Sequence, residues 1–412
     1  MTGSRSGQAI RSFWEHCFRQ DEWCDHPARS NPDVVLDRAL QRLIPLVFHV
    51  DGAEFYSNCE YYVWSLGSVL ASGEVKERTH RLVAEVIVWS MDFAFGGVAP
   101  ECGFNNEPFA GKRANRSGAQ LFGGYRFAYF GRKADYKARR ESHQFSRHYG
   151  CNLICEECMA SRPKANPALS FKDFSANAPH LLTHLSHSDY VRTATAVTAW
   201  NQMKGFHYKT VFRDPMHTVF LGTAKEVLAS CVGYWARQRY LAASMKLTIW
   251  FLAKLSMELA QGSEALAKDF NMRLIAVCLW SLQEALHILD HSDLVLAPSH
   301  AEAAHDHFMR HLQSWQHLAH ACSGMVCRLF RLRPKGHYLQ HIAMDIKRNR
   351  LNVRLTSACF YDESFLGYVK KIACSCHSLS MIKCQFWDRY LLLIAIRFEK
   401  SRRSVGAFPR VS

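Results

Sequence analysis

The sequence lacks a run of about 18 apolar residues, the minimum that a membrane-spanning helix requires. Its richest apolar stretch, residues 247–259, is interrupted by Lys254 and Glu258, so we expect no membrane span. The first twenty residues also lack the continuous apolar core of a signal peptide, because charged residues such as Arg11 and Glu15 interrupt them. No internal repeat and no low-complexity tract is present. We therefore expect an intracellular protein with no membrane anchor.

Acidic residues are scarce relative to basic ones. The chain has 36 Asp and Glu against 51 Lys and Arg, which gives a formal charge of +15. A basic balance of this size favours a polyanionic partner, most often nucleic acid, although a basic but unspecialised surface gives the same count. Hydrophobic residues at 48% and charged residues at 21% are typical of a globular chain and exclude a disordered chain, a collagen-like fibre and a coiled-coil rod. A length of 412 residues predicts two or three domains, or one domain with a large insertion.

The fifteen cysteines are odd in number and cannot all form pairs. Since no signal peptide is expected, we expect the thiols to be reduced, in the cytosol or nucleus. In those compartments two closely spaced cysteines more often bind a metal than form a disulfide.

The hydrophobic pattern predicts an α/β fold. After a weakly defined lead-in, a short apolar run at residues 43–48 ends at His-Val-Asp-Gly, which is typical of a buried strand entering a turn. The C-terminal part of the sequence is mostly helical, with a long helical stretch before a second group of motifs at residues 334–363. Further strands are expected at residues 61–70, 125–131 and 210–213, and helices at 78–95, 136–149, 217–330, 361–373 and 382–398.

Acidic residues follow two of the predicted strands. Asp51 ends the first strand, Asp135 follows the strand at 125–131, and Asp362 and Glu363 begin a late helix. Carboxylates at strand ends of an α/β sheet lie where ligand sites usually form, and three that converge would suit Mg²⁺ or Mn²⁺. Taken singly, each Asp is better explained as a turn former whose side chain caps backbone amides.

A second group combines Cys155 and Cys158 with His337 and His341. Thiolate and imidazole are the ligands of tetrahedral zinc sites, and the local spacings of both pairs are suitable. The pairs lie far apart in the chain, and a solvated or core-lining helix face is the ordinary interpretation of the two histidines. A rival ligand set lies nearer to the cysteines, on what would be one helical face: His180, His184 and His187.

The motif Asp214-Pro-Met-His217 follows a short predicted strand. Asp before Pro at this position predicts a helix N-cap, and His217 is a candidate to orient a neighbouring carboxylate. Basic clusters supply candidate phosphate contacts, with a solvated helix face as the alternative. They comprise Arg132, Lys133, Lys137, Arg139, Arg140 and the residues Lys347, Arg348 and Arg350.

In this order, the motifs resemble the catalytic core of a CACTA (En/Spm-type) DNA transposase. The resemblance covers roughly residues 40–400, and the shared order of the motifs is more specific than any one of them. The matching segments are HVDGA at 49–53, GRKAD at 131–135, CEEC at 155–158, DPMHTVFLG at 214–222, PKGHYLQH at 334–341 and CFYDE at 359–363.

The resemblance implies an RNase H-like mixed sheet interrupted by a large all-helical insertion. It implies a catalytic triad of Asp51, Asp135 and Glu363 that binds Mg²⁺ or Mn²⁺. Helical spacing instead places Asp362 on the apolar face of that helix, so the third ligand stays open between the two residues. The resemblance also joins the Cys and His pairs into one structural zinc site, because Cys155 lies 20 residues after Asp135 and His341 lies 22 residues before Glu363.

Together these inferences predict a nuclear, DNA-binding protein that cleaves and transfers DNA strands and that is a candidate homo-oligomer. The region before Asp51 is short, and residues 73–77 leave no room for a third strand, which predicts a truncated or domesticated copy. The alternative is a non-catalytic, zinc-stapled DNA-binding or interaction protein derived from a transposon. The expected divisions are a lead-in at 1–40, the core at 41–215, the helical insertion at 216–330, the return to the core at 331–400 and a basic tail at 401–412.

Overall fold

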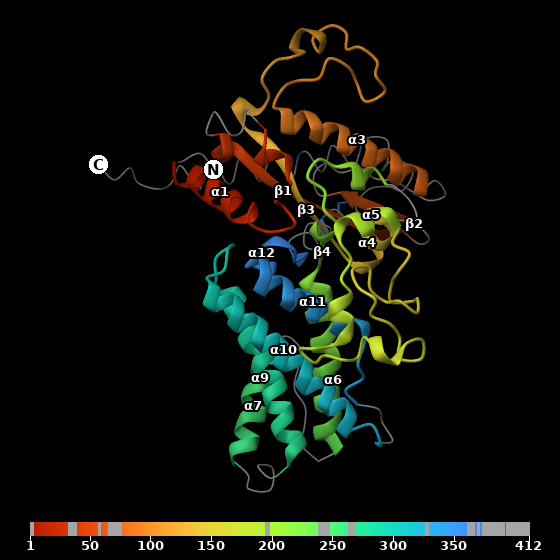
Figure 1. Ribbon diagram of the computed structural model, residues 1–412, viewed down its shortest axis with the longest axis vertical. Helices are drawn as coiled ribbons and strands as arrows, with labels where there is room; N and C mark the ends of the chain where they lie inside the picture. Colours follow the sequence, from red (N-terminus) through yellow and green to blue (C-terminus); the bar gives the residue numbers. More distant parts are fainter. Residues whose placement is uncertain are drawn as a thin grey trace, which may run out of the picture. The chain divides into compact units, whose positions relative to one another are not determined.

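The computed structural model describes most of the chain (Figure 1), and the division into two compact units differs from the expected domain boundaries. One unit comprises Met1–Phe48 and Arg81–Cys359, and the other comprises His49–His80 and Phe360–Ser412. The sheet strands β3 and β4 and the helical stretch after them therefore belong to the same unit. The described residues are 4–31, 39–56, 59–64, 76–193, 198–237, 248–262, 269–325 and 329–360, with 367, 368, 371, 372 and 392.

The strands form one sheet in the order β2-β1-β3-β4. Strand β1 spans Leu43–Tyr56 and pairs in antiparallel fashion with β2, Cys59–Trp64. Strand β3 spans Arg126–Ala134 and pairs in parallel with β4, Val211–Arg213. With helix α3 (Lys76–Gly96) between β2 and β3, this confirms the predicted mixed α/β class.

The predicted turn at Asp51-Gly52 is wrong. β1 continues to Tyr56, and Asp51 lies opposite Val63 of β2 within the ladder. Pairing with β2 satisfies the backbone groups that a turn would otherwise have used, so the Asp-Gly signal is overridden. The expected absence of a third strand falls at residues 73–77, most of which lie outside the described residues.

The N-terminal segment is better ordered than the expected lead-in. Helix α1 (Ser4–Cys17) buries Phe13 and Trp14, and the turn after it buries Trp23, which stacks on Phe130 of β3 with ring centroids 5.0 Å apart. The indole N–H of Trp14 donates to the Leu43 carbonyl at 2.7 Å. The expectation failed because Arg5, Arg11, Glu15 and Arg19 conceal a helix with one apolar face.

The helical stretch that the sequence predicts is present. The chain enters it through a π-helical segment, Met216–Thr223, which continues as α6, Ala224–Arg237. Its other helices are α7 (Thr248–Gly262), α9 (Phe270–Asp290) and α10 (Pro298–Ala321). Figure 1 shows α7, α9 and α10 packed along one another, and one continuous apolar core joins them. We refer to α6, α7, α9 and α10 as the helical bundle.

Helix α9 is long and apolar enough to cross a membrane by length and composition alone. Half of its apolar window is buried inside the protein, where α9 packs against α7 and α10. A core helix meets the same criteria, and residues such as Ile275 and Leu279 of α9 are fully buried.

Helix α11 (Pro334–Asn349) packs against α10 and against the π-helical segment. Its close approach requires a glycine at position 336, since a Cβ there would lie 2.6 Å from Phe174 and 2.9 Å from Trp315. The short helix α12 (Val353–Thr356) follows, and the side chain of its N-cap Asn352 accepts the Arg354 N–H. The helices expected at 361–373 and 382–398, with Asp362 and Glu363, and the tail at 401–412 lie outside the described residues, apart from isolated positions.

Candidate metal centre

The two cysteines lie in a loop between β3 and β4. After β3, helix α4 (Tyr136–His143) is shorter than the helix predicted for 136–149, because Gln144 adopts a left-handed conformation with φ 50° and ends it. The loop then folds over a small apolar cluster that contains Ile154, Cys155 and Cys158, all of them fully buried. The backbone N–H of Ile154 donates to the Ala160 carbonyl at 2.9 Å, which closes the loop around both thiols.

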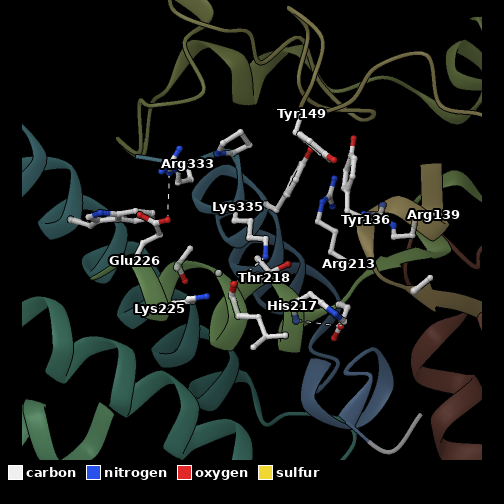
Figure 2. Close-up of a pocket in the computed structure, with 18 residues that line it drawn as sticks. Tyr136, Arg139, Tyr149, Arg213, His217, Thr218, Lys225, Glu226, Arg333 and Lys335 are labelled. Carbon is white, nitrogen blue, oxygen red and sulfur yellow. Dashed lines mark hydrogen bonds and ion pairs between the residues drawn. The ribbon is translucent and has the colours of Figure 1, made fainter. Parts of the chain in front are cut away.

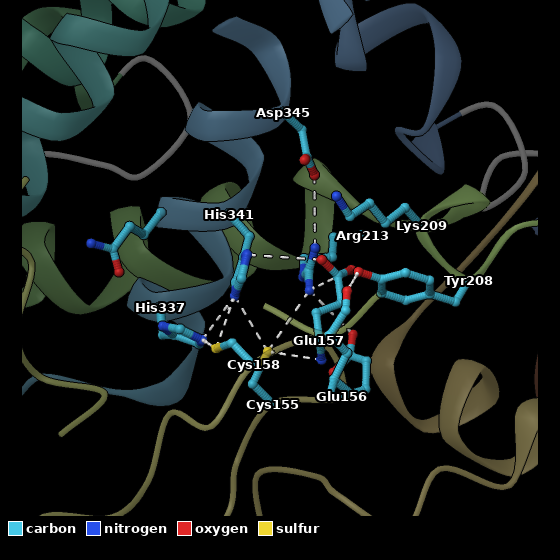
Figure 3. A network of polar contacts seen from close by, with 12 residues as sticks. Cys155, Glu156, Glu157, Cys158, Tyr208, Lys209, Arg213, His337, His341 and Asp345 are labelled. Atoms are coloured by element: carbon cyan, nitrogen blue, oxygen red, sulfur yellow. Dashed lines mark hydrogen bonds and ion pairs between the residues drawn. The ribbon is translucent and has the colours of Figure 1, made fainter. Parts of the chain in front are cut away.

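The two histidines come from α11. His337 and His341 lie one turn apart on the same helical face, and both are buried. Figure 3 shows their rings directed at the two sulfurs. Cys155 Sγ lies 3.3 Å from His341 Nε2, Cys158 Sγ lies 3.4 Å from His337 Nε2, and the two imidazole nitrogens are 3.0 Å apart.

These separations fit four ligands of one tetrahedral ion. Zinc bonds of about 2.3 Å to sulfur and about 2.0–2.1 Å to nitrogen place tetrahedral ligand atoms about 3.3–3.8 Å from one another. The four ligand atoms all lie within 4.8 Å of one another and are shielded from solvent. The predicted convergence of the Cys and His pairs is therefore confirmed, and the cluster is able to bind a metal such as zinc.

The protonation states favour metal binding. Burial, the Arg213 guanidinium and His337 lower the pKa of His341 to about 3, so its imidazole is neutral and able to coordinate a metal. A hydrogen bond from the Cys155 thiol lowers the pKa of Cys158, and the contacts with His337 and His341 act in the same direction. The thiolate of Cys158 and the neutral imidazole of His341 are donors of the kind that zinc prefers.

Buried ion pairs connect the cysteine loop to the sheet. Glu156 and Glu157, between the two cysteines, both contact Arg213 at the end of β4, at 3.5 Å and 2.7 Å. Glu156 also pairs with Arg139 of α4 at 2.6 Å. Glu157 lies 3.9 Å from His341 Nδ1, on the side of the ring opposite the sulfurs. Such outer carboxylates hold a ligating imidazole in position.

The rival histidine set does not converge. His180 lies in a 3-10 turn, Pro179–Thr183, where it contacts Gln340, and His184 follows that turn. The turn ends at Thr183 and His184 is extended, so the continuous helix that would align the three side chains does not form. His187 stacks on His207 instead, with ring centroids 4.6 Å apart. His180 and His184 do flank the cluster, at 4.9 Å and 5.0 Å from the rings of His337 and His341.

One alternative ligand set does involve His184. Glu157, His184 and His341 offer ligand atoms within 4.8 Å of one another. His184 is exposed in this set, whereas all four members of the Cys and His set are buried. We favour the cysteine-containing set because it supplies four ligands and two sulfurs.

The carboxylates predicted to bind a second kind of metal are placed as follows. Asp135 directly follows β3 and caps α4, since its Oδ1 accepts the Ala138 N–H at 2.7 Å. Asp51 lies in β1 and in the other compact unit, and only its backbone is described. Glu363 and Asp362 lie outside the described residues. The structure therefore gives no test of the triad.

Asp214 has the cap role that the sequence predicts. Its Oδ1 accepts the Met216 N–H at 2.8 Å and the Cys359 N–H at 3.0 Å, and its Oδ2 contacts His217 Nδ1. Asp214 is buried, so these three partners replace solvent around its carboxylate. His217 does contact a neighbouring carboxylate, as expected, and that carboxylate is Asp214.

Two of the predicted phosphate contacts need correction. Arg132 is fully buried, with its guanidinium 4.4 Å from the centre of the Trp200 ring. Arg139 is buried in its ion pair with Glu156. A strand residue inside the sheet core and a helix residue facing the cysteine loop cannot reach a phosphate from these positions. Lys137 is exposed, whereas Lys133 and Arg140 are half-buried.

A pocket of about 380 Å³ lies beside the metal cluster and next to Ala134, the residue before Asp135. Figure 2 shows Lys335 in the middle of this pocket, with Tyr136 and Tyr149 on one side and Lys225 on the other. Sequence reasoning missed these four residues, although Lys335 belongs to the PKGHYLQH motif at 334–341. It also missed Arg213, for which the acidic pair inside the CxxC motif was the available signal.

Comparison with protein-family models gives no match to this chain, and comparison with curated proteins gives none either.

Proposed function

We propose that the protein is a transposase-like DNA nuclease and strand transferase with an RNase H-like core, in a truncated or domesticated form. Its catalytic residues would be Asp51, Asp135 and Glu363, with Asp362 as the alternative third ligand. Its partners would be DNA and a second copy of the chain, and its location would be nuclear.

The observation that carries this proposal is the convergence of Cys155 and Cys158 with His337 and His341. Residues 179 positions apart in the chain meet in one buried cluster. No local feature of either pair requires this meeting, whereas the resemblance to a CACTA transposase core implies it. The proposal is therefore supported by a contact between residues that are distant in the sequence.

The surroundings of the cluster are those of an α/β sheet. The cysteine loop lies between β3 and β4 of a sheet that mixes antiparallel and parallel pairs. Asp135 begins the connection that leads to the cysteines, and Arg213 ends the strand that follows them. Zinc would therefore attach the return segment at α11 to the part of the sheet that Asp135 follows.

Bound between such carboxylates, two Mg²⁺ or Mn²⁺ ions supply activation of an attacking oxygen and stabilisation of a leaving oxygen in phosphodiester cleavage. Asp135 has one carboxylate oxygen engaged in the α4 cap, and within the described residues its other oxygen accepts no hydrogen bond. The cap fixes the side chain, so the second oxygen of Asp135 is held in place and stays able to bind a metal ion.

The test compares DNA binding with DNA nicking. We expect Asp51→Asn and Asp135→Asn each to leave DNA affinity within a few-fold and to abolish Mg²⁺-dependent nicking of supercoiled DNA, since a carboxylate ligand is lost while basic contacts remain. The matched control is Asp306→Asn, an exposed position on α10, which should retain nicking. Wild-type nicking by either Asn variant would reject the assignment.

A second candidate function is a non-catalytic, zinc-stapled DNA-binding or interaction protein. Four buried protein ligands leave no open position for a substrate and are typical of structural zinc, which is the role that this candidate assigns to the cluster. Both candidates predict DNA binding that weakens with salt, since lysine and arginine contacts release counterions. Cleavage that depends on Mg²⁺ separates them, because only the first candidate predicts it.

A further inference from the structure

The pocket beside the metal cluster has a basic side. Lys225 and Lys335 line it, and among the described residues no carboxylate forms an ion pair with either ammonium group. Lys335 reaches across Gly222, where a Cβ would lie 2.6 Å from its side chain, and donates to the Leu221 carbonyl at 3.1 Å. An anion between the two ammonium groups would offset their mutual repulsion.

The opposite side of the pocket is aromatic. Tyr136 stacks on Tyr338 with ring centroids 5.1 Å apart and an interplanar angle of 17°. Tyr149 packs edge-on against Tyr136, also at 5.1 Å, and is half-exposed at the rim. Figure 2 shows Tyr136 and Tyr149 facing the pocket that Lys335 enters. Planar bases stack on aromatic rings of this kind without sequence preference.

The arginines beneath the tyrosines are already neutralised. Arg213 pairs with Glu157 at 2.7 Å and Arg139 with Glu156 at 2.6 Å. The unpaired positive charge of the pocket therefore lies on the lysine side, away from the rings. A pocket with lysines on one side and aromatic rings on the other suits a ligand that carries both a phosphate and a base. The volume of about 380 Å³ lies within the range of small-ligand pockets, about 300–1,000 Å³.

The position of the pocket indicates that the ligand belongs to a DNA strand. Ala134 lines it and Asp135 follows directly, so an occupant would lie beside a carboxylate proposed for strand cleavage. Both Asp135 and Asp214 are near enough to act on the charge of Lys335. We propose, resting on the proposed function, that this pocket takes one unpaired nucleotide of the DNA substrate, with its phosphate on Lys225 and Lys335 and its base against Tyr149 and Tyr136.

Extruding a base costs least where the base is already unpaired. The pocket therefore predicts a preference for DNA that carries an unpaired nucleotide. The probes are two fluorescent duplexes of one sequence, one fully paired and one with a single-nucleotide bulge, whose dissociation constants are measured by anisotropy without added Mg²⁺. We expect the bulged duplex to bind about tenfold more tightly to the wild-type protein.

Tyr149→Leu is expected to remove the preference and to retain binding of the paired duplex, because this exposed side chain contributes stacking and little packing. Lys225→Gln is expected to weaken binding of the bulged duplex and to reduce its salt dependence. Lys172→Gln, at an exposed position remote in sequence from the pocket-lining residues, is the matched control and should change neither affinity.

The outcomes separate this inference from the function on which it rests. Equal binding of both duplexes by the wild-type protein, or a preference that Tyr149→Leu retains, would overturn the nucleotide pocket while leaving DNA binding intact. Failure to bind either duplex would reject the proposed function as well. Binding of a free deoxynucleotide is measured for the same variants. If the pocket variants lose this binding and still bind the bulged duplex as the wild-type protein does, the pocket belongs to a small metabolite and the inference is overturned.

Discussion

The helical bundle and the loop segment at residues 144–210 differ in what holds them together. In the bundle, α9 and α10 extend over 21 and 24 residues and share one continuous apolar core with α6, α7 and α11. In the described part of the loop segment the longest helix is α5 (His187–Thr193), with seven residues. Phe174 joins the core of the bundle, whereas the other clusters of the loop segment's buried apolar side chains are small, and one of them contains the two cysteines themselves.

The loop segment relies on polar cross-links where the bundle relies on packing. Arg213, Glu156 and Glu157 form a buried charge network, and the cysteines face the histidines of α11. Short turns of this kind cannot bury enough apolar surface to offset their conformational entropy. This difference predicts that the loop segment needs a metal to be stable, whereas the bundle does not.

Removal of the metal should therefore cause the largest loss of stability, and this loss should be confined to the loop segment. We expect the purified protein to contain one zinc ion per chain and Cys158→Ser to lose it. Structural zinc contributes about 10–16 kcal/mol of apparent binding free energy in small zinc domains, which far exceeds the effect of an ordinary substitution. Zinc content is measured by elemental analysis, and limited proteolysis should show new cleavage within 144–210 while the bundle stays resistant.

Cys151→Ser provides the matched control, because Cys151 lies in the same loop and its thiol donates to the Ser146 carbonyl, at 3.6 Å, and not to the cluster. That variant should retain zinc. Well-folded protein without zinc would reject the site. Retention of zinc in a His337→Ala and His341→Ala variant, with loss in His184→Ala, would show that the wrong ligands were chosen.

Packing should dominate in the bundle. Leu279 of α9 is fully buried in the apolar core, so Leu279→Ala is expected to lower the free energy of unfolding by about 2–5 kcal/mol. The loss of unfolding free energy should be the same with and without a chelator, because the substitution leaves its cavity in the bundle and not at the metal cluster. Urea unfolding followed by circular dichroism measures it. Val277→Ala, a more exposed change on the same helix, should cost far less. A loss for Leu279→Ala that disappears after chelation would break the comparison.

The same contrast decides what the sequence could predict. Apolar periodicity identified α3, β3, β4 and the bundle, because long amphipathic elements record their burial in sequence. It missed α1, whose apolar face is interleaved with charges, and it placed a turn at Asp51, where pairing with β2 prevails. The failures fall where tertiary contacts override local signals.

The loop segment was predictable only in part. Spacing alone identified the Cys pair and the His pair, but their meeting came from the resemblance and not from local chemistry. The network of Arg213 with Glu156 and Glu157 depends on the distance between β4 and the loop, which no sequence pattern records. The pocket at Lys335 is likewise formed by elements distant in sequence.

The smallest expected effect concerns a buried histidine in the bundle. His311 of α10 is fully buried, its Nδ1 contacts the Cys278 carbonyl at 2.9 Å, and burial lowers its pKa to about 4. Its neutral form is therefore favoured in the folded state, and protonation favours unfolding. The contribution is fully present above the unfolded pKa of about 6.5 and is lost as the pH falls toward 4.

At pH 5 this difference amounts to about 2 kcal/mol. We expect His311→Leu to reduce the loss of unfolding free energy between pH 7 and pH 5 by that amount, and His317→Leu, at an exposed position of α10, to leave it unchanged. Acid also weakens metal binding to Cys and His, but both variants retain the metal cluster, so the difference between their urea titrations isolates the bundle. An identical pH dependence in the two variants would mean that the bundle core admits a charged His311, and the contrast between a packed bundle and a polar loop segment would be weaker than the structure indicates.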